Sequence, residues 1–185
     1  MRRVRKSFYV AIWFTFLALF VTSAPTASVI RQVILEEVVQ NAEFVFEGQV
    51  ISEETRPSPI DGRTFTYFTF DITDVIKGSY SGNYIELGFA GGTLNDVTLC
   101  VSGMHMPEIG EKGIYFVESL KKELVHPLYG WHQGHYLVVQ NPSDGIEKIV
   151  PVRTPPSGMI AAPTVTQFKQ NLRDIIRENP HEMAH

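Results

Sequence analysis

Four histidines in the second half of the chain are the residues whose type and spacing best suit chemistry. His126, His132 and His135 lie within ten residues, and His105 precedes them. Imidazole nitrogens are ordinary zinc ligands, and zinc needs three or four N, S or O donors at about 2 Å. Because His132 and His135 are three residues apart, they would face opposite sides of a regular strand. They converge only if Gln133-Gly134 bends the chain.

Two hypotheses follow from this histidine-rich segment. In the first, His126, His132 and His135 bind a metal, either in a metal-binding protein or in a metal-dependent hydrolase. In the second, the segment is a loop leading into a strand, with one or two imidazoles hydrogen-bonded. The chain has no His-Glu-x-x-His motif, which would mark a metalloprotease site. We therefore expect no metal and no other cofactor, and keep metal binding as the alternative.

Aromatic and glycine residues offer a different kind of site. Tyr129-Gly130-Trp131 can form a flat recognition face for a peptide or a sugar, although Trp131 can equally fill the end of a barrel. Gly91-Gly92 lacks the following helix and lysine of a phosphate loop, so it predicts a bulge or a close backbone approach.

Three further polar residues, Glu108, Glu111 and Cys100, are of types that can take part in chemistry. Glu108 and Glu111 are in a predicted turn and are expected to be solvated. Cys100 is the only cysteine, so no intrachain disulfide forms, and its alternating surroundings predict a buried thiol. No complete catalytic set is present, and we predict that the protein is not an enzyme.

The first 27 residues have the layout of a secretory signal peptide. An apolar stretch from Phe8 to Val21 is shorter than the roughly 18–20 residues that span a bilayer as a helix. Small, neutral residues follow it, as at a cleavage site. The basic residues that precede it are Arg2, Arg3, Arg5 and Lys6. We expect export to the periplasm or the extracellular space, with no stable membrane anchor after cleavage.

The charge balance limits the class of partner. The whole chain has 16 basic and 20 acidic residues, and the leader holds four of the basic ones and no acidic one. Residues 28–185 therefore carry 12 basic and 20 acidic side chains, a net charge of −8. Binding to phosphates needs clusters of Lys and Arg, so a nucleic-acid partner is not expected.

Side-chain periodicity predicts a mainly β domain over residues 28–152. A helix is expected over 29–41, capped by Ser28, and a second begins at Thr164 or Thr166 after a linker that starts at residue 153. A disordered tail is expected from His181. Strands are predicted over 44–51, 63–76, 84–89, 99–101, 114–120, 134–140 and 146–152. Because turns rather than helices separate these strands, they predict an antiparallel OB-like β-barrel with a flanking helix at each end.

Three motifs carry a resemblance to a known family. They are Phe46-Glu47-Gly48-Gln49-Val50, the segment Phe70–Gly78, and Pro107–Phe116 after the Gly-Gly loop. This succession resembles the OB-fold barrels of the netrin-like group, which includes the tissue inhibitors of metalloproteinases. It is also similar to small exported bacterial proteins of uncharacterised function, in which a Gly-Trp-x-Gln-Gly-like stretch recurs; here that stretch is residues 130–134.

The resemblance implies fold more than activity. The inhibitors grip a catalytic zinc through an amino-terminal cysteine, which this chain lacks, so their mechanism does not carry over. What remains is an exported, non-enzymatic binding module whose expected partner is a secreted protein, with a secreted metalloprotease as one case. The residues expected to bind it, in exposed loops, are Gly91, Gly92, His105, Tyr129, Trp131 and His132.

Overall fold

The computed structural model describes residues 33–153 and 162–178. The predicted signal peptide, most of the linker and the tail lie outside these ranges. The helices are α2 (Leu35–Asn41), α3 (Val165–Glu178) and the 3-10 helix η1 (Trp131–Gly134). The strands are β1 (Phe44–Pro57), β2 (Thr64–Lys77), β3 (Tyr84–Ala90), β4 (Gly92–Leu94), β5 (Val97–Leu99), β6 (Lys112–Val117), β7 (His135–Gln140) and β8 (Glu147–Pro151).

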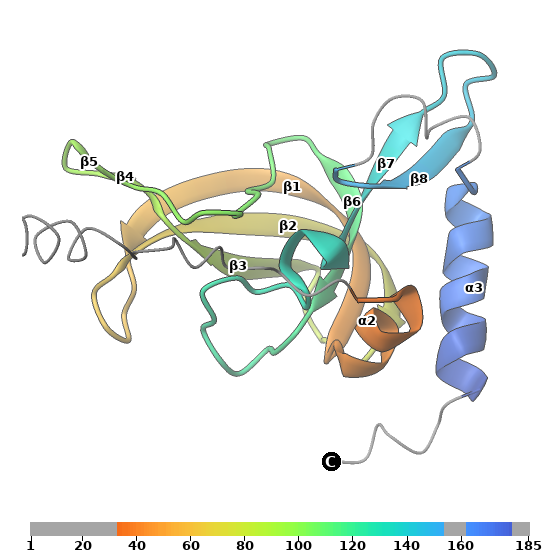
Figure 1. Cartoon of the computed structure of the whole chain (residues 1–185), viewed down its shortest axis with the longest axis horizontal. Helices are drawn as coiled ribbons and strands as arrows, with labels where there is room; N and C mark the ends of the chain where they lie inside the picture. Colours follow the sequence, from red (N-terminus) through yellow and green to blue (C-terminus); the bar gives the residue numbers. More distant parts are fainter. Residues whose placement is uncertain (1–32, 154–161, 179–185) are drawn as a thin grey trace, which may run out of the picture. The chain divides into compact units, whose positions relative to one another are not determined.

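The described chain is mainly β, built on one antiparallel sheet of six strands (Figure 1). The strand order is β3-β2-β1-β6-β7-β8, and β4 and β5 form a separate two-stranded hairpin. The mainly β, antiparallel prediction with two flanking helices is thus confirmed. Within the described residues β3 and β8 are edges that do not pair with each other, so the closed OB-like barrel stays a prediction.

Strands β1 and β2 form a long, bent ribbon (Figure 1). The pairing shifts register between Val45 and Phe46, between Glu47 and Gly48, and between Val50 and Ser52. Such irregularities increase local twist and bend a strand. β1 extends beyond the predicted 44–51 because its pairing with β2 continues to Pro57, although the side chains from Ile51 to Glu54 are exposed.

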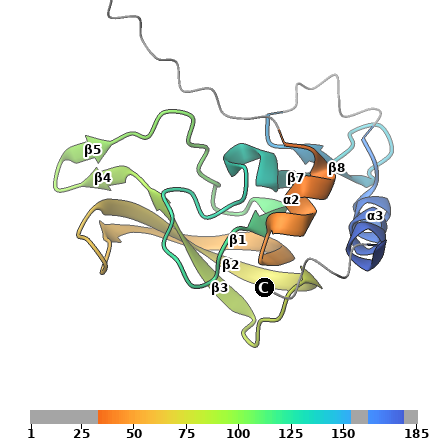
Figure 2. The ribbon, with the colours of Figure 1, turned by 60° about the horizontal axis from the view of Figure 1, so that its bottom comes forward.

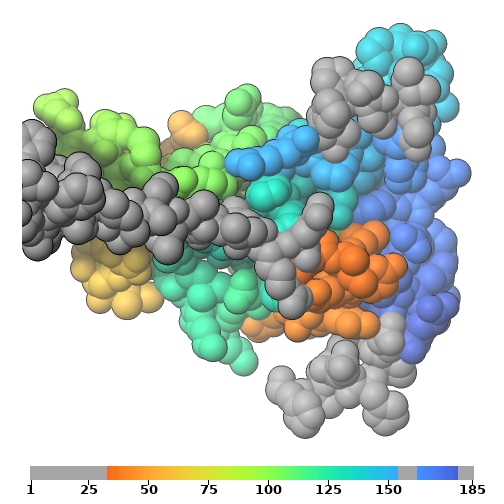
Figure 3. Space-filling view, viewed as in Figure 1, coloured from red at the N-terminus to blue at the C-terminus, as the bar shows by residue number. Residues whose placement is uncertain are grey.

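The alternation of side chains along the strands builds two large apolar cores on opposite faces of the sheet, and Phe65, Tyr67 and Ala90 form a third, smaller cluster. On β6, Ile114 and Phe116 face the first core, whereas Tyr115 and Val117 face the second. Helices α2 and α3 cover the first core and lie beside each other (Figures 1 and 3). The second core is rich in aromatic rings; its buried members are Phe44, Phe46, Val50, Phe68, Phe70, Ile85, Leu87, Phe89, Tyr115, Val117 and Leu128.

The apolar stripe predicted for the last helix is the face that α3 buries. Thr164 caps the helix, because its hydroxyl accepts from the Gln167 N–H at 3.2 Å while the Gln167 amide oxygen accepts from the Thr164 N–H at 3.0 Å. Lys169 then joins α3 to the sheet through Glu47 at 2.6 Å and Asp74 at 2.8 Å. The stripe residues are Val165, Phe168, Leu172, Ile175 and Ile176.

The side chain of Lys77 closes the carboxyl end of α2. Its Nζ donates to the carbonyl oxygens of Val39, Gln40 and Ala42 at 2.8, 2.7 and 2.7 Å. The last carbonyls of a helix have no partner within the helix and carry the negative end of its dipole. A cation at this position therefore stabilises the junction of α2 with β2.

Replacing Lys77 by methionine is expected to lower the free energy of unfolding by about 2 kcal/mol, because charged donors to three carbonyls are lost while the aliphatic stem is kept. Urea unfolding measures the change. Lys112→Met is the matched control, since Lys112 is exposed and lies 3.8 Å from Glu147 at the surface. That variant is expected to lose about 0.5 kcal/mol or less, and equal losses in both variants would contradict the role given to Lys77.

Candidate functional site

A bend at Gly130–Trp131 brings the predicted histidines together. Gly130 and Trp131 both have positive φ, 64° and 60°, and η1 follows before β7 begins at His135. A positive φ is uncommon for tryptophan and favours a tight reversal of the chain. Gln133 fixes this segment, because its Oε1 accepts from the Val33 N–H at 2.8 Å. The bend that the sequence required for His132 and His135 is therefore present.

His135 is held at the centre of the cluster by a carboxylate. Its side chain is fully buried, and its Nε2 lies 2.7 Å from Oε1 of Glu111, which also accepts from the Tyr115 hydroxyl at 3.0 Å. A carboxylate accepts, so Nε2 carries the proton. The other ring nitrogen, Nδ1, is buried and has no partner among the described residues.

His126 has the opposite tautomer. Its Nδ1 accepts from the Leu128 N–H at 3.2 Å, so the proton of the neutral ring is on Nε2. The ring lies between Phe89 and Trp131, with centroid distances of 5.0 and 5.3 Å. Burial, followed by repulsion from neighbouring histidines, lowers the pKa of His126 to about 3. Its Nε2–H is a buried donor without a partner among the described residues.

His105 and His132 complete the cluster from its more accessible side. Both are half-buried, and each has one buried nitrogen without a described partner, Nε2 in His105 and Nδ1 in His132. Burial is the main cause that lowers the pKa of both rings; for His132 the Arg153 charge acts in the same direction. The His105 and His135 rings lie 5.4 Å apart. Burial therefore favours the neutral form of three of these rings, His105, His126 and His132.

The metal hypothesis based on His126, His132 and His135 is not supported by this geometry. Among residues 33–153 and 162–178, no three His, Cys, Asp or Glu side chains are placed to hold one metal ion. In its present tautomer His126 has no free lone pair for a metal. Its Nδ1 accepts from the Leu128 N–H, and its Nε2 carries the proton.

The residues predicted for partner binding are placed differently from the expectation. None of the six is fully exposed: Gly91 is buried and the other five are half-buried. Trp131 stacks on His126, and the Tyr129 hydroxyl donates to Glu37 of α2 at 3.2 Å. Trp131 and Tyr129 thus take part in packing the fold, and the binding role of the six residues stays a prediction.

Gly91 and Gly92 make the close approach that the sequence predicted. Their φ values are 115° and 122°, a region that side chains strain to adopt. The Thr66 hydroxyl donates to the Gly91 carbonyl at 2.9 Å, and a Cβ on Gly92 would lie 2.8 Å from Cγ2 of Thr55.

Two single-residue expectations are wrong. Glu111 is not solvated: 14% of its side chain is exposed, and it bonds to His135 and Tyr115, whereas Glu108 is exposed as expected. Cys100 is exposed rather than buried, because it lies beyond the short β5 strand. Sequence alone offered no signal for the Glu111–His135 pair, since the two residues meet only through the pairing of β6 with β7.

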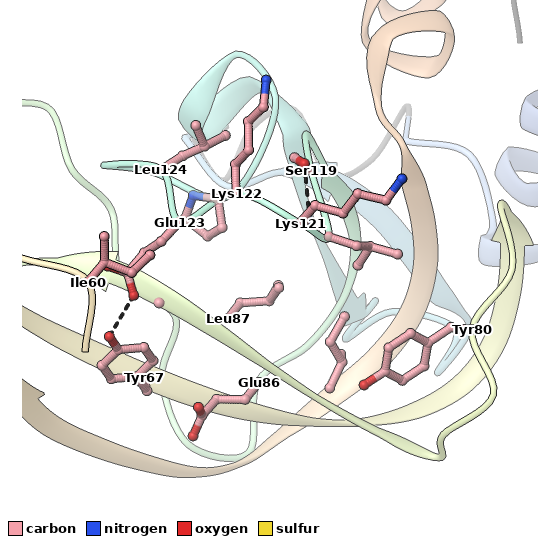
Figure 4. A pocket seen from close by; sticks show the side chains of 14 residues that line it. Ile60, Tyr67, Tyr80, Glu86, Leu87, Ser119, Lys121, Lys122, Glu123 and Leu124 are labelled. Atoms are coloured by element: carbon pink, nitrogen blue, oxygen red, sulfur yellow. Dashed lines mark hydrogen bonds between the residues drawn. The ribbon is translucent and has the colours of Figure 1, made fainter. Parts of the chain in front are cut away.

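A second candidate site is a groove beside the edge strand β3. The hollow next to β3 has a volume of 320 Å³ and is closed on one side by the loop 119–124 (Figure 4). Leu87 points from β3 into this hollow, and Tyr67 and Glu123 meet across it at 2.7 Å (Figure 4). An adjoining hollow of 660 Å³ continues along Lys77, Glu118 and the same loop. Together they form what we term the β3 groove. Residues of β3, Tyr67, Tyr80 and the loop 118–127 line the first hollow, and the same loop, residues 40–43 and Lys77-Gly78 line the second.

The backbone of β3 faces this groove with unused hydrogen-bonding groups. At one end of β3 the Ile72 N–H of β2 donates to the Asn83 carbonyl, and at the other end the Ala90 N–H donates away from β2, to the Val125 carbonyl at 2.9 Å. In an antiparallel pair the backbone groups of successive residues alternate between the partner strand and the outer side. The N–H groups of Glu86 and Gly88 therefore point away from β2. Among the described residues neither has a backbone acceptor on that side.

The charges around the groove fall into two groups. Two carboxylates are already engaged: Glu86 pairs with Arg56 at 2.6 Å, and Glu123 accepts from Tyr67 and Ser58. Burial, followed by the hydrogen bond to Glu123, raises the pKa of Tyr67 to about 12. Lys121 and Lys122 are exposed on the rim, and the ion pairs of the described chain include neither. The rim thus offers two free positive charges.

Comparisons with known proteins add no relative: no family model, no curated protein and no solved structure matches this chain. None of the helices in residues 33–153 and 162–178 combines the length and the apolar character needed to cross a bilayer. The candidate sites therefore rest on the geometry described above.

Proposed function

We propose that this chain is an exported, non-enzymatic OB-like binding module that takes up an extended segment of a secreted protein along the edge of β3. The observation that carries this proposal is the row of outward-facing N–H groups at Glu86 and Gly88, beside a preformed groove. An unpaired sheet edge is a template for one more strand.

The groove suits side chains that alternate along such a segment. In an added strand, every second side chain points toward the same face. The floor that they would meet is apolar, since Ile85 and Leu87 belong to the aromatic core. The partner segment is therefore extended, with apolar residues at alternate positions.

The rim selects for negative charge on the partner. Lys121 and Lys122 extend away from the floor of the hollow (Figure 4), where a carboxylate at one end of the segment reaches them. Such surface charges contribute more to orientation and association rate than to affinity. The resemblance to the netrin-like group makes a secreted metalloprotease one partner to examine.

Replacing Glu86 by proline is expected to weaken binding of an extended peptide about 30-fold, because one backbone donor is lost and its acceptor is left unsatisfied. The probe is a blocked synthetic peptide of alternating valine and threonine that carries one glutamate, and binding is followed by fluorescence anisotropy. Proline is tolerated at an edge strand whose N–H faces outward, so the variant is expected to fold.

Glu86→Ala is the matched control, since it removes the Arg56 ion pair but keeps the backbone N–H. It is expected to bind within about 3-fold of the wild type. A second control is the same peptide methylated on alternate backbone nitrogens, which cannot pair with β3. Equal weakening by both Glu86 variants, or unchanged binding of the methylated peptide, would rule out strand addition.

A further inference from the structure

The outer edge of β3 is open over a short stretch only, because the chain closes it at both ends. At the carboxyl end of β3 the Ala90 N–H already donates to the Val125 carbonyl at 2.9 Å. At the amino end the Tyr80 hydroxyl donates to the Tyr84 carbonyl at 3.1 Å. That carbonyl points away from β2, so the Tyr80 phenol lies beside the edge. Between these two ends, the outward backbone groups of residues 86–88 have no backbone partner among the described residues.

This short opening limits what can pair with β3. The stretch from Tyr84 to Ala90 spans about 20 Å of extended chain. A segment from the middle of a longer strand would run past both ends, where it would meet the Tyr80 ring and the loop that carries Val125. A segment that stops inside the opening avoids one of these two collisions. The edge therefore suits the end of a chain better than its middle.

The charges around the hollow next to β3 favour a carboxyl end over an amino end. An amino terminus would need a free carboxylate, but Glu86 is in an ion pair and Glu123 accepts from two hydroxyl groups. Glu118 is exposed, but it lines the adjoining hollow and not this one. Lys121 and Lys122 line both hollows, and the ion pairs of the described chain include neither. The charges that remain available are therefore positive.

The direction of an added strand agrees with this charge. A strand that pairs antiparallel with β3 has its carboxyl end opposite Tyr84, where β3 begins. The Tyr84 N–H also points outward, and it has no backbone acceptor within the described ranges. Tyr80 and Lys121 lie toward the same end of the groove (Figure 4), and the adjoining hollow, which Lys121 and Lys122 also line, continues to Lys77-Gly78. One backbone donor and two ammonium groups are thus available where the carboxylate would lie.

We propose that the β3 groove binds the free carboxyl-terminal tail of a partner chain, antiparallel to β3, with the terminal carboxylate near the Tyr84 N–H and held by Lys121 and Lys122. This inference rests on the proposed function, since it names the part of a protein that the β3 edge takes up. Charged hydrogen bonds from backbone N–H groups and cations are a general means of holding a terminal carboxylate. The bound tail is about five residues long, because the opening spans about 20 Å.

The test compares peptides of one alternating valine and threonine sequence, labelled at the amino end and free of glutamate. One ends in a carboxylate and the other in an amide, and fluorescence anisotropy measures their binding. The free acid is expected to bind about 10-fold more tightly, because only it forms charged hydrogen bonds at its end. Extending the acid by a short Gly-Ser segment is expected to weaken binding by about the same factor, because the carboxylate is displaced and the chain meets Tyr80.

The lysines are tested by the double variant Lys121→Met, Lys122→Met. It is expected to bind the acid and the amide within about 2-fold of each other, with the affinity for the amide unchanged, because the methionines keep the stems and remove only the charges. Lys112→Met is the matched control, since Lys112 is an exposed lysine near Glu147 and does not line the groove. It is expected to keep the full difference between acid and amide.

The closed end of the edge is tested at Tyr80, an exposed residue whose ring contacts Phe44 at 5.5 Å. Tyr80→Ala opens this end, so the Gly-Ser extension is expected to weaken binding less than it does in the wild type. Tyr80→Phe keeps the ring in place and is expected to keep the whole effect of the extension. Equal effects of the extension in both variants would contradict the role given to the Tyr80 ring.

The outcomes separate this inference from the proposed function. Equal binding of the acid and the amide would overturn the carboxyl-terminal site and leave strand addition to β3 in place. No binding of either peptide would overturn strand addition, and the carboxyl-terminal site with it. A preference for the acid that persists in the double variant would overturn the role of Lys121 and Lys122.

Discussion

Replacing Phe46 by alanine is expected to lower the free energy of unfolding by about 4 kcal/mol, the largest effect of any single change considered for this fold. Phe46 is fully buried on the central strand β1. Its ring stacks on Phe44 and Tyr115 at 5.3 Å each and meets the edge of Phe70 at 5.7 Å. Truncation removes these contacts and leaves a cavity, because a sheet held on both sides cannot collapse around it. Urea unfolding followed by circular dichroism measures the loss.

Tyr84→Ala is the control for Phe46→Ala, since Tyr84 is also an aromatic residue on a strand but is 58% exposed. It is expected to cost about 0.5 kcal/mol or less. A loss at Phe46 no greater than that at Tyr84 would show that the aromatic core does not stabilise the sheet.

The positions of most strands could be predicted because aromatic and β-branched side chains run along them between turn residues, even where both faces are buried, as in β2 and β6. Phe65, Tyr67 and Thr69 alternate with Thr66, Phe68 and Phe70, and β2 covers the predicted segment with a shift of one residue at each end. Helix α3 could be predicted as well, because its apolar residues repeat at helical spacing.

The hairpin β4–β5 shows where the pattern fails. Its strands have three residues each and are mostly exposed, so they carry no burial pattern to detect. They are joined by Asn95-Asp96, whose φ values of 49° and 62° suit a tight hairpin turn. The hairpin lies at the end of the sheet opposite the two helices (Figure 2). Only the turn residues could have indicated it.

The candidate sites were less predictable than the fold because they depend on pairing between distant segments. Glu111 meets His135 only once β6 and β7 are in register, with Tyr115 opposite His135. The tautomer of His126 depends on a single backbone N–H two residues away. The β3 groove exists because β3 is an edge strand of the sheet. The composition of the chain does not show which strand will be at the edge.

Acidification from pH 7 to pH 5 is expected to destabilise the protein by about 2 kcal/mol through His126 alone. The folded pKa is about 3, against an ordinary value of 6.5. Between these two values the unfolded chain binds a proton that the folded chain excludes. Stability is therefore fully present above about pH 6.5 and falls as the pH decreases toward 3. The lowered pKa values of His105 and His132 act with the same sign.

Urea unfolding at the two pH values, with a metal chelator present, measures this dependence. His126→Asn removes the titrating ring, while the asparagine amide oxygen still accepts from the Leu128 N–H. The loss of unfolding free energy between pH 7 and pH 5 is therefore expected to be smaller by about 2 kcal/mol, whatever the stability of the variant at pH 7. His132→Asn, at a half-buried position, is expected to keep most of it. The range stops at pH 5 because the carboxylates titrate below it. Among them is Asp74: burial acts to raise its pKa, but Lys169 and Arg173 together lower it below the ordinary value. An undiminished dependence in His126→Asn would show that this ring is not the group that the folded state keeps neutral.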